Sequence, residues 1–195
     1  MAKILKKLST LFKGSPADSK PKKHSLPQTK AQTDLFIAIR KQKTQDAIFL
    51  IEDHHISINT QSSDGCSLLQ SALLHKDFAL ANWLIQKGAE LNTTNKHYEP
   101  VIITATRLEN IEQVEQILFH HANPNVTNGE GNTALHIASQ KDHRPIIIRL
   151  LEKGADPHIK NRVGQTAISI ANQNRQDSLA KLLASRYEDV KARPA

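Results

Sequence analysis

The sequence is poor in cysteine, in aromatic residues and in long apolar runs. It has one cysteine in 195 residues, Cys66, so no disulfide can form within the chain, which suits a reducing compartment. Aromatic residues make up only 4%, so the core must be mostly aliphatic. No run of about 18 apolar residues occurs, so we expect no transmembrane helix. Lys6 and Lys7 interrupt the first apolar stretch, which argues against a secretory signal.

The positive charge is confined to the first thirty residues. The chain carries a formal charge of +7, and residues 1–30 hold eight lysines and one acid, Asp18, which already gives +7. The remaining residues then hold 26 − 8 = 18 basic and 19 − 1 = 18 acidic side chains. A domain that binds nucleic acid should carry its basic residues on the folded face, so we expect no nucleic-acid partner.

Residue patterns that mark catalytic or metal sites are also lacking. There is no glycine-rich phosphate loop, no G-x-S-x-G sequence and no paired-cysteine motif. The adjacent pairs His54-His55 and His120-His121 have no nearby cysteine, and neighbouring side chains diverge, so they are a poor metal site. Cys66 lacks a recurring histidine and acid partner. We therefore predict a protein that is not an enzyme and has no metal or cofactor.

What the chain does have is an internal repeat with a constant period of 164 − 131 = 33 residues. The segment GNTALHIA at 131–138 returns as GQTAISIA at 164–171. Three kinds of position share this spacing: an apolar residue, then a small residue, then an apolar pair. The apolar positions are Leu69, Ile102, Leu135 and Ile168, and the small ones are Ala72, Ala105, Ala138 and Ala171. A poorer copy starts at Leu35, one residue further from Leu69 than the period requires, and we place its extra residue in the loop near His55 to Ser57.

Residues 128–160 show how one unit folds. Asn128, Gly129 and Gly131 indicate a tight turn. Thr133 can cap a short helix, and Pro145 suits the first turn of a second helix that carries an apolar stripe. A helix pair of this size cannot bury its apolar face alone, so several units must stack.

This pattern resembles the ankyrin repeat. The match lies in Gly131, Thr133-Ala134-Leu135-His136, Ala138, Leu150-Leu151 and Gly154-Ala155-Asp156, and similar units cover roughly residues 31–186. The resemblance implies an all-α solenoid of helix–turn–helix repeats with short hairpin loops, with His136 ordering the turn near Thr133. The glycine that usually ends the first helix is replaced, which costs local stability. The replacements are Lys76, Glu109, Asp142 and Arg175.

We expect a tail at 1–30 and a repeat domain at 31–193, with units at about 31–61, 62–94, 95–127, 128–160 and 161–193. The resemblance implies that hairpin tips and first helices line a concave surface that binds another protein. Leu74, Gly129 and Val163 fall on it. The partner-binding candidates are Asp64, His75, Lys96, His97, Glu99, Arg107, Leu108, Glu130, Asn132, Gln140, Lys141, Arg162 and Gln165. Their mixed charges suit a protein partner and do not suit a polyanion.

The tail suggests an alternative role. Its apolar residues between 3 and 13 fall on one helical face beside lysines, which fits a helix lying on an anionic membrane. The same pattern fits a partner-bound helix or an organelle-targeting segment, although the latter usually favours arginine. The membrane-contact candidates are Ile4, Leu5, Leu8, Leu11 and Phe12. We therefore predict a non-enzymatic, monomeric, cytoplasmic interaction module. The alternatives are a peripheral membrane tether, or an effector-type adaptor that bacteria deliver into host cells.

Overall fold

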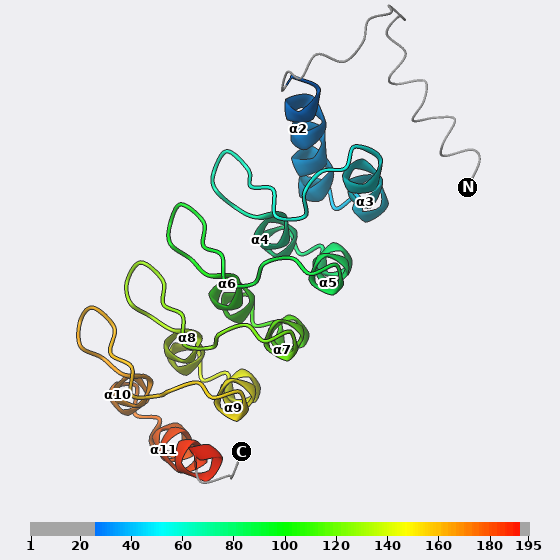
Figure 1. Cartoon of the computed structure of the whole chain (residues 1–195). Coiled ribbons are helices and arrows are strands. Elements are labelled where there is room, and N and C mark those ends of the chain that lie inside the picture. The colour runs from blue at the N-terminus through cyan, green and yellow to red at the C-terminus, as the bar shows by residue number, and fades with distance from the viewer. Residues whose placement is uncertain (1–25, 192–195) are drawn as a thin grey trace, which may run out of the picture.

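The computed structural model describes residues 26–191, which form five helix pairs and no β-strand. Figure 1 shows one row of inner helices and one row of outer helices, with hairpin loops projecting beside the inner row. The inner helices are α2 (Leu26–Arg40), α4 (Leu68–Leu74), α6 (Val101–Arg107), α8 (Ala134–Gln140) and α10 (Ala167–Gln173). The outer helices are α3 (Thr44–Asp53), α5 (Phe78–Gln86), α7 (Ile111–Phe119), α9 (Arg144–Glu152) and α11 (Asp177–Lys191). The predicted all-α solenoid is confirmed.

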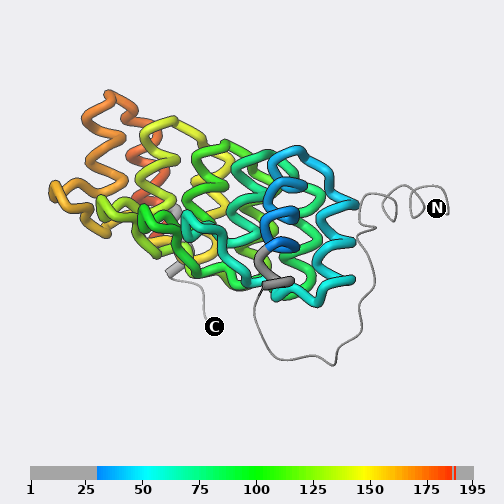
Figure 2. The backbone as a smooth tube through the Cα atoms, turned by 90° about the horizontal axis from the view of Figure 1, so that it is seen from above, coloured from blue at the N-terminus to red at the C-terminus, as the bar shows by residue number. Residues whose placement is uncertain are grey.

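The units pack in sequence order, as the view from above makes clear (Figure 2). Each inner helix packs against the outer helix of its own pair and against the next inner helix. Outer helices likewise pack on the outer helices of neighbouring pairs. The stack is therefore built from contacts between adjacent units, as expected for a solenoid.

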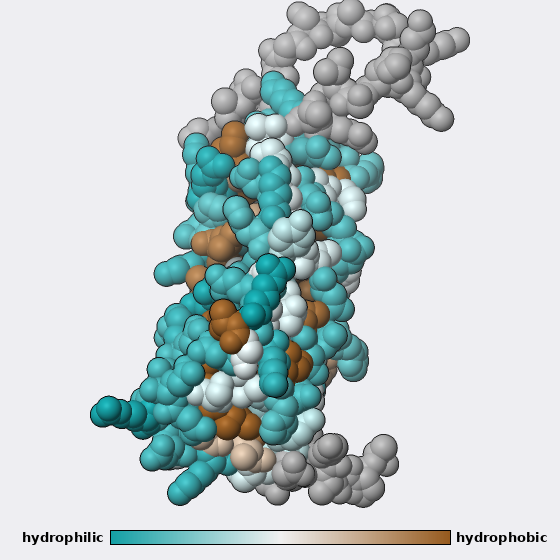
Figure 3. All heavy atoms as spheres, turned by 90° about the vertical axis from the view of Figure 1, so that its left-hand side faces the viewer, coloured by the Kyte–Doolittle hydropathy of each residue, from teal (hydrophilic) through white to brown (hydrophobic). Residues whose placement is uncertain are grey.

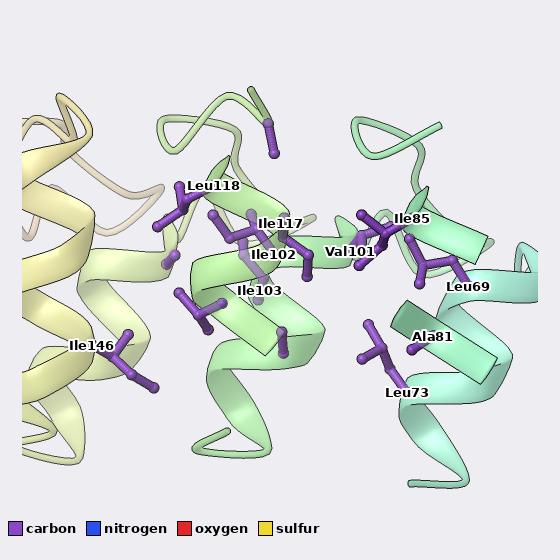
Figure 4. Close-up of a cluster of buried hydrophobic side chains, with 14 of the residues drawn as sticks. Leu69, Leu73, Ala81, Ile85, Val101, Ile102, Ile103, Ile117, Leu118 and Ile146 are labelled. Atoms are coloured by element: carbon purple, nitrogen blue, oxygen red, sulfur yellow. The ribbon is translucent and has the colours of Figure 1, made fainter. Parts of the chain in front are cut away.

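The core is a continuous band of aliphatic side chains between the units (Figure 4). Leu69, Leu73, Ile103 and Ile117 are fully buried, and none of the fully buried large side chains of the described residues is aromatic. Trp83 only packs at the edge of this core. The expectation of an aliphatic core, drawn from the low aromatic content, is confirmed.

A residue with left-handed backbone follows each short inner helix. These residues are Lys76, Glu109, Asp142 and Arg175, with φ of 58, 56, 50 and 57°. The chain turns sharply there, and the next outer helix begins two residues later in each case. Glycine adopts this conformation without steric cost, whereas for other residues it costs about 1–2 kcal/mol. The predicted loss of local stability at these four positions therefore has a structural basis.

The extra residue of the first unit lies in α3, and its predicted place in the loop at 55–57 is wrong. In the first four units, residues with a left-handed backbone follow the inner and the outer helix, and their numbers locate the extra residue. From Gln42 to His55 the numbering advances by 55 − 42 = 13, whereas from Lys76 to Gly88 it advances by 88 − 76 = 12. The additional residue must therefore lie between Gln42 and His55, and α3 has 10 residues where α5 has 9.

The predicted membrane-contact residues at 3–13 lie outside the described residues. Between residues 26 and 191, none of the helices combines the length and the apolar character needed to cross a membrane.

Candidate functional site

Four hairpin loops stand side by side along one edge of the stack, at residues 62–66, 95–99, 128–132 and 161–165. In three of them, an asparagine side chain fixes the loop by accepting two backbone N–H groups. Asn128 Oδ1 accepts from Glu130 at 3.0 Å and from Asn132 at 2.9 Å. Asn95 and Asn161 make the same pair of bonds. Sequence reasoning missed this role, although the three asparagines recur at the period of the repeat and were a visible signal.

Hydrogen bonds also hold some hairpins to the preceding unit. Gln70 on α4 donates to the Glu99 carbonyl at 2.6 Å, and His136 on α8 bonds the Gln165 carbonyl at 3.0 Å. Ile103 occupies the equivalent position on α6. Between the last two hairpins, the Arg162 N–H donates to the Glu130 carbonyl at 3.0 Å. The loops therefore form a supported surface.

His136 orders the turn before α8, as the resemblance implied. Its Nδ1 accepts the Thr133 backbone N–H at 3.1 Å and lies 2.8 Å from the Thr133 hydroxyl oxygen. Its Nε2 then carries the proton that is donated to Gln165. Burial lowers the pKa of His136 below its ordinary value, although hydrogen bonds to the Gln165 and Ile159 backbones act the other way. The ring is a neutral framework group.

The predicted charged residues of the surface largely pair with one another. Lys96 Nζ lies 3.8 Å from Asp64 Oδ1, and Arg107 Nε lies 2.7 Å from Glu99 Oε1. Lys141 pairs with Glu109 and also donates to the Arg107 carbonyl at 3.0 Å. Most of these side chains are substantially exposed, so each pair adds little stability. Their effect is to neutralise the surface locally.

The remaining candidates divide into exposed and framework residues. His97, Glu130, Gln140 and Arg162 are exposed. The half-buried candidates are His75, whose Nδ1 lies 2.8 Å from the Ser71 carbonyl oxygen, Leu108, which packs against the core, and Gln165, which bonds Gln173 at 2.7 Å.

Asn132 belongs to the framework, since it is only 5% exposed. Its side chain donates to Glu130 and accepts from Asn161, each at 2.9 Å. Because its side-chain NH2 group and carbonyl oxygen both bond within the loops and the residue is buried, Asn132 offers little surface to a partner.

Three large apolar side chains are exposed on this surface: Leu74 (49%), Tyr98 (69%) and Val163 (77%). Figure 3 shows the face with the hairpins as mostly hydrophilic, with separate hydrophobic patches. Other units carry polar residues at the positions of Leu74 and Val163. They are Arg107 and Gln140 for Leu74, and Asp64, His97 and Glu130 for Val163. Sequence reasoning missed Tyr98, although it stands where the other hairpins have glycine.

The outer helices carry a different feature. A hollow of about 290 Å³ lies between α7 and α9, with Leu118 and Phe119 in its lining. Arg149 donates from Nε to Glu115 at 2.6 Å and from Nη1 to Glu152 at 2.9 Å. Phe119 is 67% exposed. The charges of this hollow are therefore largely satisfied within the protein.

The histidines of the described residues and Cys66 form no metal-binding cluster. Among residues 26–191, no three His, Cys, Asp or Glu side chains are grouped so that they could hold a metal ion. Burial is the largest influence on the Cys66 thiol and raises its pKa, which lowers its nucleophilicity at neutral pH.

A comparison with protein families finds a match to this architecture. A family model described as ankyrin repeats, in three copies, matches residues 102–193. This stretch includes the hairpins at 128–132 and 161–165 and the helices from α7 onward. The two earlier helix pairs continue the same stack with the same left-handed turns.

Proposed function

Because the chain is an ankyrin repeat protein, and ankyrin repeats are generally protein–protein interaction modules, we propose that it binds a partner protein through its concave face. We use "concave face" for the hairpin loops together with the C-terminal ends of the inner helices. The family is typically non-enzymatic, and we infer that this chain acts by binding rather than by catalysis.

One observation carries the proposal. On the concave face, the framework is polar and internally paired, yet Leu74 and Val163 are exposed where the corresponding residues of other units are polar. An exposed apolar residue at a position that other units fill with polar ones is not needed for the scaffold. It is the kind of residue that contributes binding energy when a partner removes it from water.

The test is affinity capture from source-cell lysate, with the full chain as bait. The first variant combines Leu74→Gln and Val163→Glu, which are the residues found at those positions in the fourth unit. The matched control is Phe119→Gln on the outer helices, because Phe119 is similarly exposed and Gln86 stands at its position in α5. Circular dichroism melts confirm that both variants fold.

We expect a partner that the wild type and Phe119→Gln both capture and that the concave-face variant loses. A partner kept by the concave-face variant and lost with Phe119→Gln would move the site to the hollow between α7 and α9. A partner kept by both variants would place binding elsewhere.

A second candidate function, a peripheral membrane tether, rests on the amphipathic pattern of residues 3–13. Flotation of the full chain with anionic liposomes tests it, beside a variant carrying Leu5→Glu and Leu8→Glu. We expect binding at low salt that the variant loses. If the wild type does not float with the liposomes at low salt, the tether is refuted.

A further inference from the structure

We propose that Tyr98 is the aromatic anchor of the concave face, and that it receives an apolar side chain from an extended polypeptide segment of the partner. This inference rests on the proposed function, and it adds the residue and the partner chemistry. It is argued from the left-handed backbone of Tyr98 and from the glycine, Gly129, that faces it on the next hairpin.

The backbone at Tyr98 is left-handed, with φ of 54°. Gly65, Gly131 and Gly164 occupy the same position of the other three hairpins, with φ of 69, 79 and 79°. Glycine adopts this conformation freely, whereas a tyrosine is strained there. Strained residues of this kind persist where the surroundings hold them, and they often mark binding sites.

The neighbouring hairpin is adapted to this tyrosine. At two of the other hairpins, the glycine lies against a residue of the next loop that has a long side chain. A Cβ on Gly65 would lie 3.1 Å from Lys96 Cγ, and one on Gly131 would lie 2.9 Å from the Arg162 nitrogen. At Tyr98 the arrangement is reversed, because the facing residue is Gly129, whose added Cβ would lie 3.7 Å from Tyr98 Cβ. The large residue and the glycine have exchanged places.

The fold does not use the tyrosine ring. Tyr98 is 69% exposed. Within the described residues its ring takes part in neither of the two aromatic pairs and not in the cation–π contact of Lys87 with Trp83. Apart from its approach to Gly129, packing inside the protein compensates little of the strain at Tyr98. A ring held over the bare backbone of Gly129 is instead a flat surface open to a partner.

The charges around Tyr98 define what can bind there. Lys96 faces Asp64, and Glu99 is bound to Arg107, so the residues on either side of the ring are compensated within the chain. A strongly acidic or basic partner would gain little from such a surface. The occupant that fits is an uncharged stretch of polypeptide whose apolar side chain lies on the ring.

The experiment selects peptides from a random linear library displayed on phage, with the full chain as target. Enriched peptides are synthesised, and their affinities are measured for wild type, Tyr98→Gly, the double variant Tyr98→Gly with Gly129→Lys, Phe119→Gln, and the concave-face variant with Leu74→Gln and Val163→Glu. The double variant gives the second and third hairpins the glycine–lysine pair that Gly65 and Lys96 form between the first and second hairpins. Unfolding curves establish that every variant is folded.

We expect enriched peptides to share an apolar or aromatic residue, and to bind both Tyr98→Gly variants at least about tenfold more weakly than wild type. Phe119→Gln should bind like wild type. The inference is overturned by peptides that bind Tyr98→Gly as tightly as wild type, by selection of charged peptides, or by failure to enrich any peptide. If binding then depends on Leu74 and Val163, the proposed function still stands. If it depends on none of the three, the proposed function fails as well.

Discussion

Replacing Gly131 and Gly164 by alanine, one at a time, measures how closely one hairpin rests on the next. The two glycines occupy the same position of successive hairpins and share a φ of 79°. A Cβ on Gly131 would lie 2.9 Å from the Arg162 nitrogen and 3.2 Å from Asn161 Cα. A Cβ on Gly164 would meet nothing within 4 Å. The pair therefore differs only in the contact with a following loop.

The expected magnitudes follow from this geometry. Alanine with a left-handed backbone costs about 1–2 kcal/mol, and the stiffer unfolded chain offsets about 0.4–1 kcal/mol of this. Gly164→Ala should therefore lower the free energy of unfolding by roughly 1 kcal/mol. Gly131→Ala adds a clash with backbone atoms that cannot rotate away, which costs a further ~1–3 kcal/mol.

Urea unfolding of the full chain, followed by circular dichroism, gives both values. Because the two substitutions change the unfolded chain in the same way, their difference isolates the contact between hairpins. Equal losses for the two variants would refute the close approach of the third and fourth loops. A larger loss for Gly164→Ala would contradict the reasoning from backbone geometry altogether.

Three further predictions concern the stability effects of His136, Asn128 and Tyr98. Because burial lowers the pKa of His136, the unfolded chain binds a proton at this residue more readily than the folded chain does. The contribution of neutral His136 to folding stability is therefore fully present above about pH 6.5 and is lost as the pH falls through the folded pKa. His136→Gln should flatten the decline of stability in acid, measured by urea titrations, and an unchanged profile would contradict this. Asn128→Ala leaves two loop N–H groups without their acceptor and should cost about 1–3 kcal/mol in urea unfolding, whereas a loss near zero would show that water replaces the side chain. Tyr98→Gly should instead raise the thermal midpoint by a few degrees, since it relieves the left-handed strain, and a lower midpoint would show that the ring stabilises the fold.

The repeat made the fold predictable. The regular period of apolar and small residues determines which helix faces are buried, and the stacking of units follows because no single pair can bury its own face. Even the sharp turns at Lys76 and Glu109 were predictable, because they fall where the period requires a left-handed residue. The place of the extra residue in the first unit was not, because a helix can lengthen by one residue without any change in the surrounding sequence pattern.

The surface was much less predictable. The candidates follow from position in the unit, which says where a side chain starts but not what it meets in the next unit. Lys96 meets Asp64, and Lys141 meets Glu109, across neighbouring units. Such pairs depend on how far one loop is offset from the next. The repeat register already places Tyr98 where the other hairpins have glycine, but only the backbone angle shows that it adopts their left-handed conformation.

The hydrogen bonds from Gln70 and His136 also decide which hairpins are tied to the inner helix of the preceding unit. They tie the third unit to the second and the fifth to the fourth. Between the third and fourth units, Ile103 stands at the equivalent position of α6, and an aliphatic side chain cannot make such a bond. That seam is held by apolar packing and by polar contacts away from this position: the ion pairs of Lys141 with Glu109 and of Arg149 with Glu115, and the hydrogen bonds of Asn125 with Gly154 and Asp156. The hairpin at 128–132 is instead bound to the hairpin that follows it, through Arg162 and Asn161. When the stack bends or is pulled, we therefore expect this hairpin to move with the fifth unit rather than with the third.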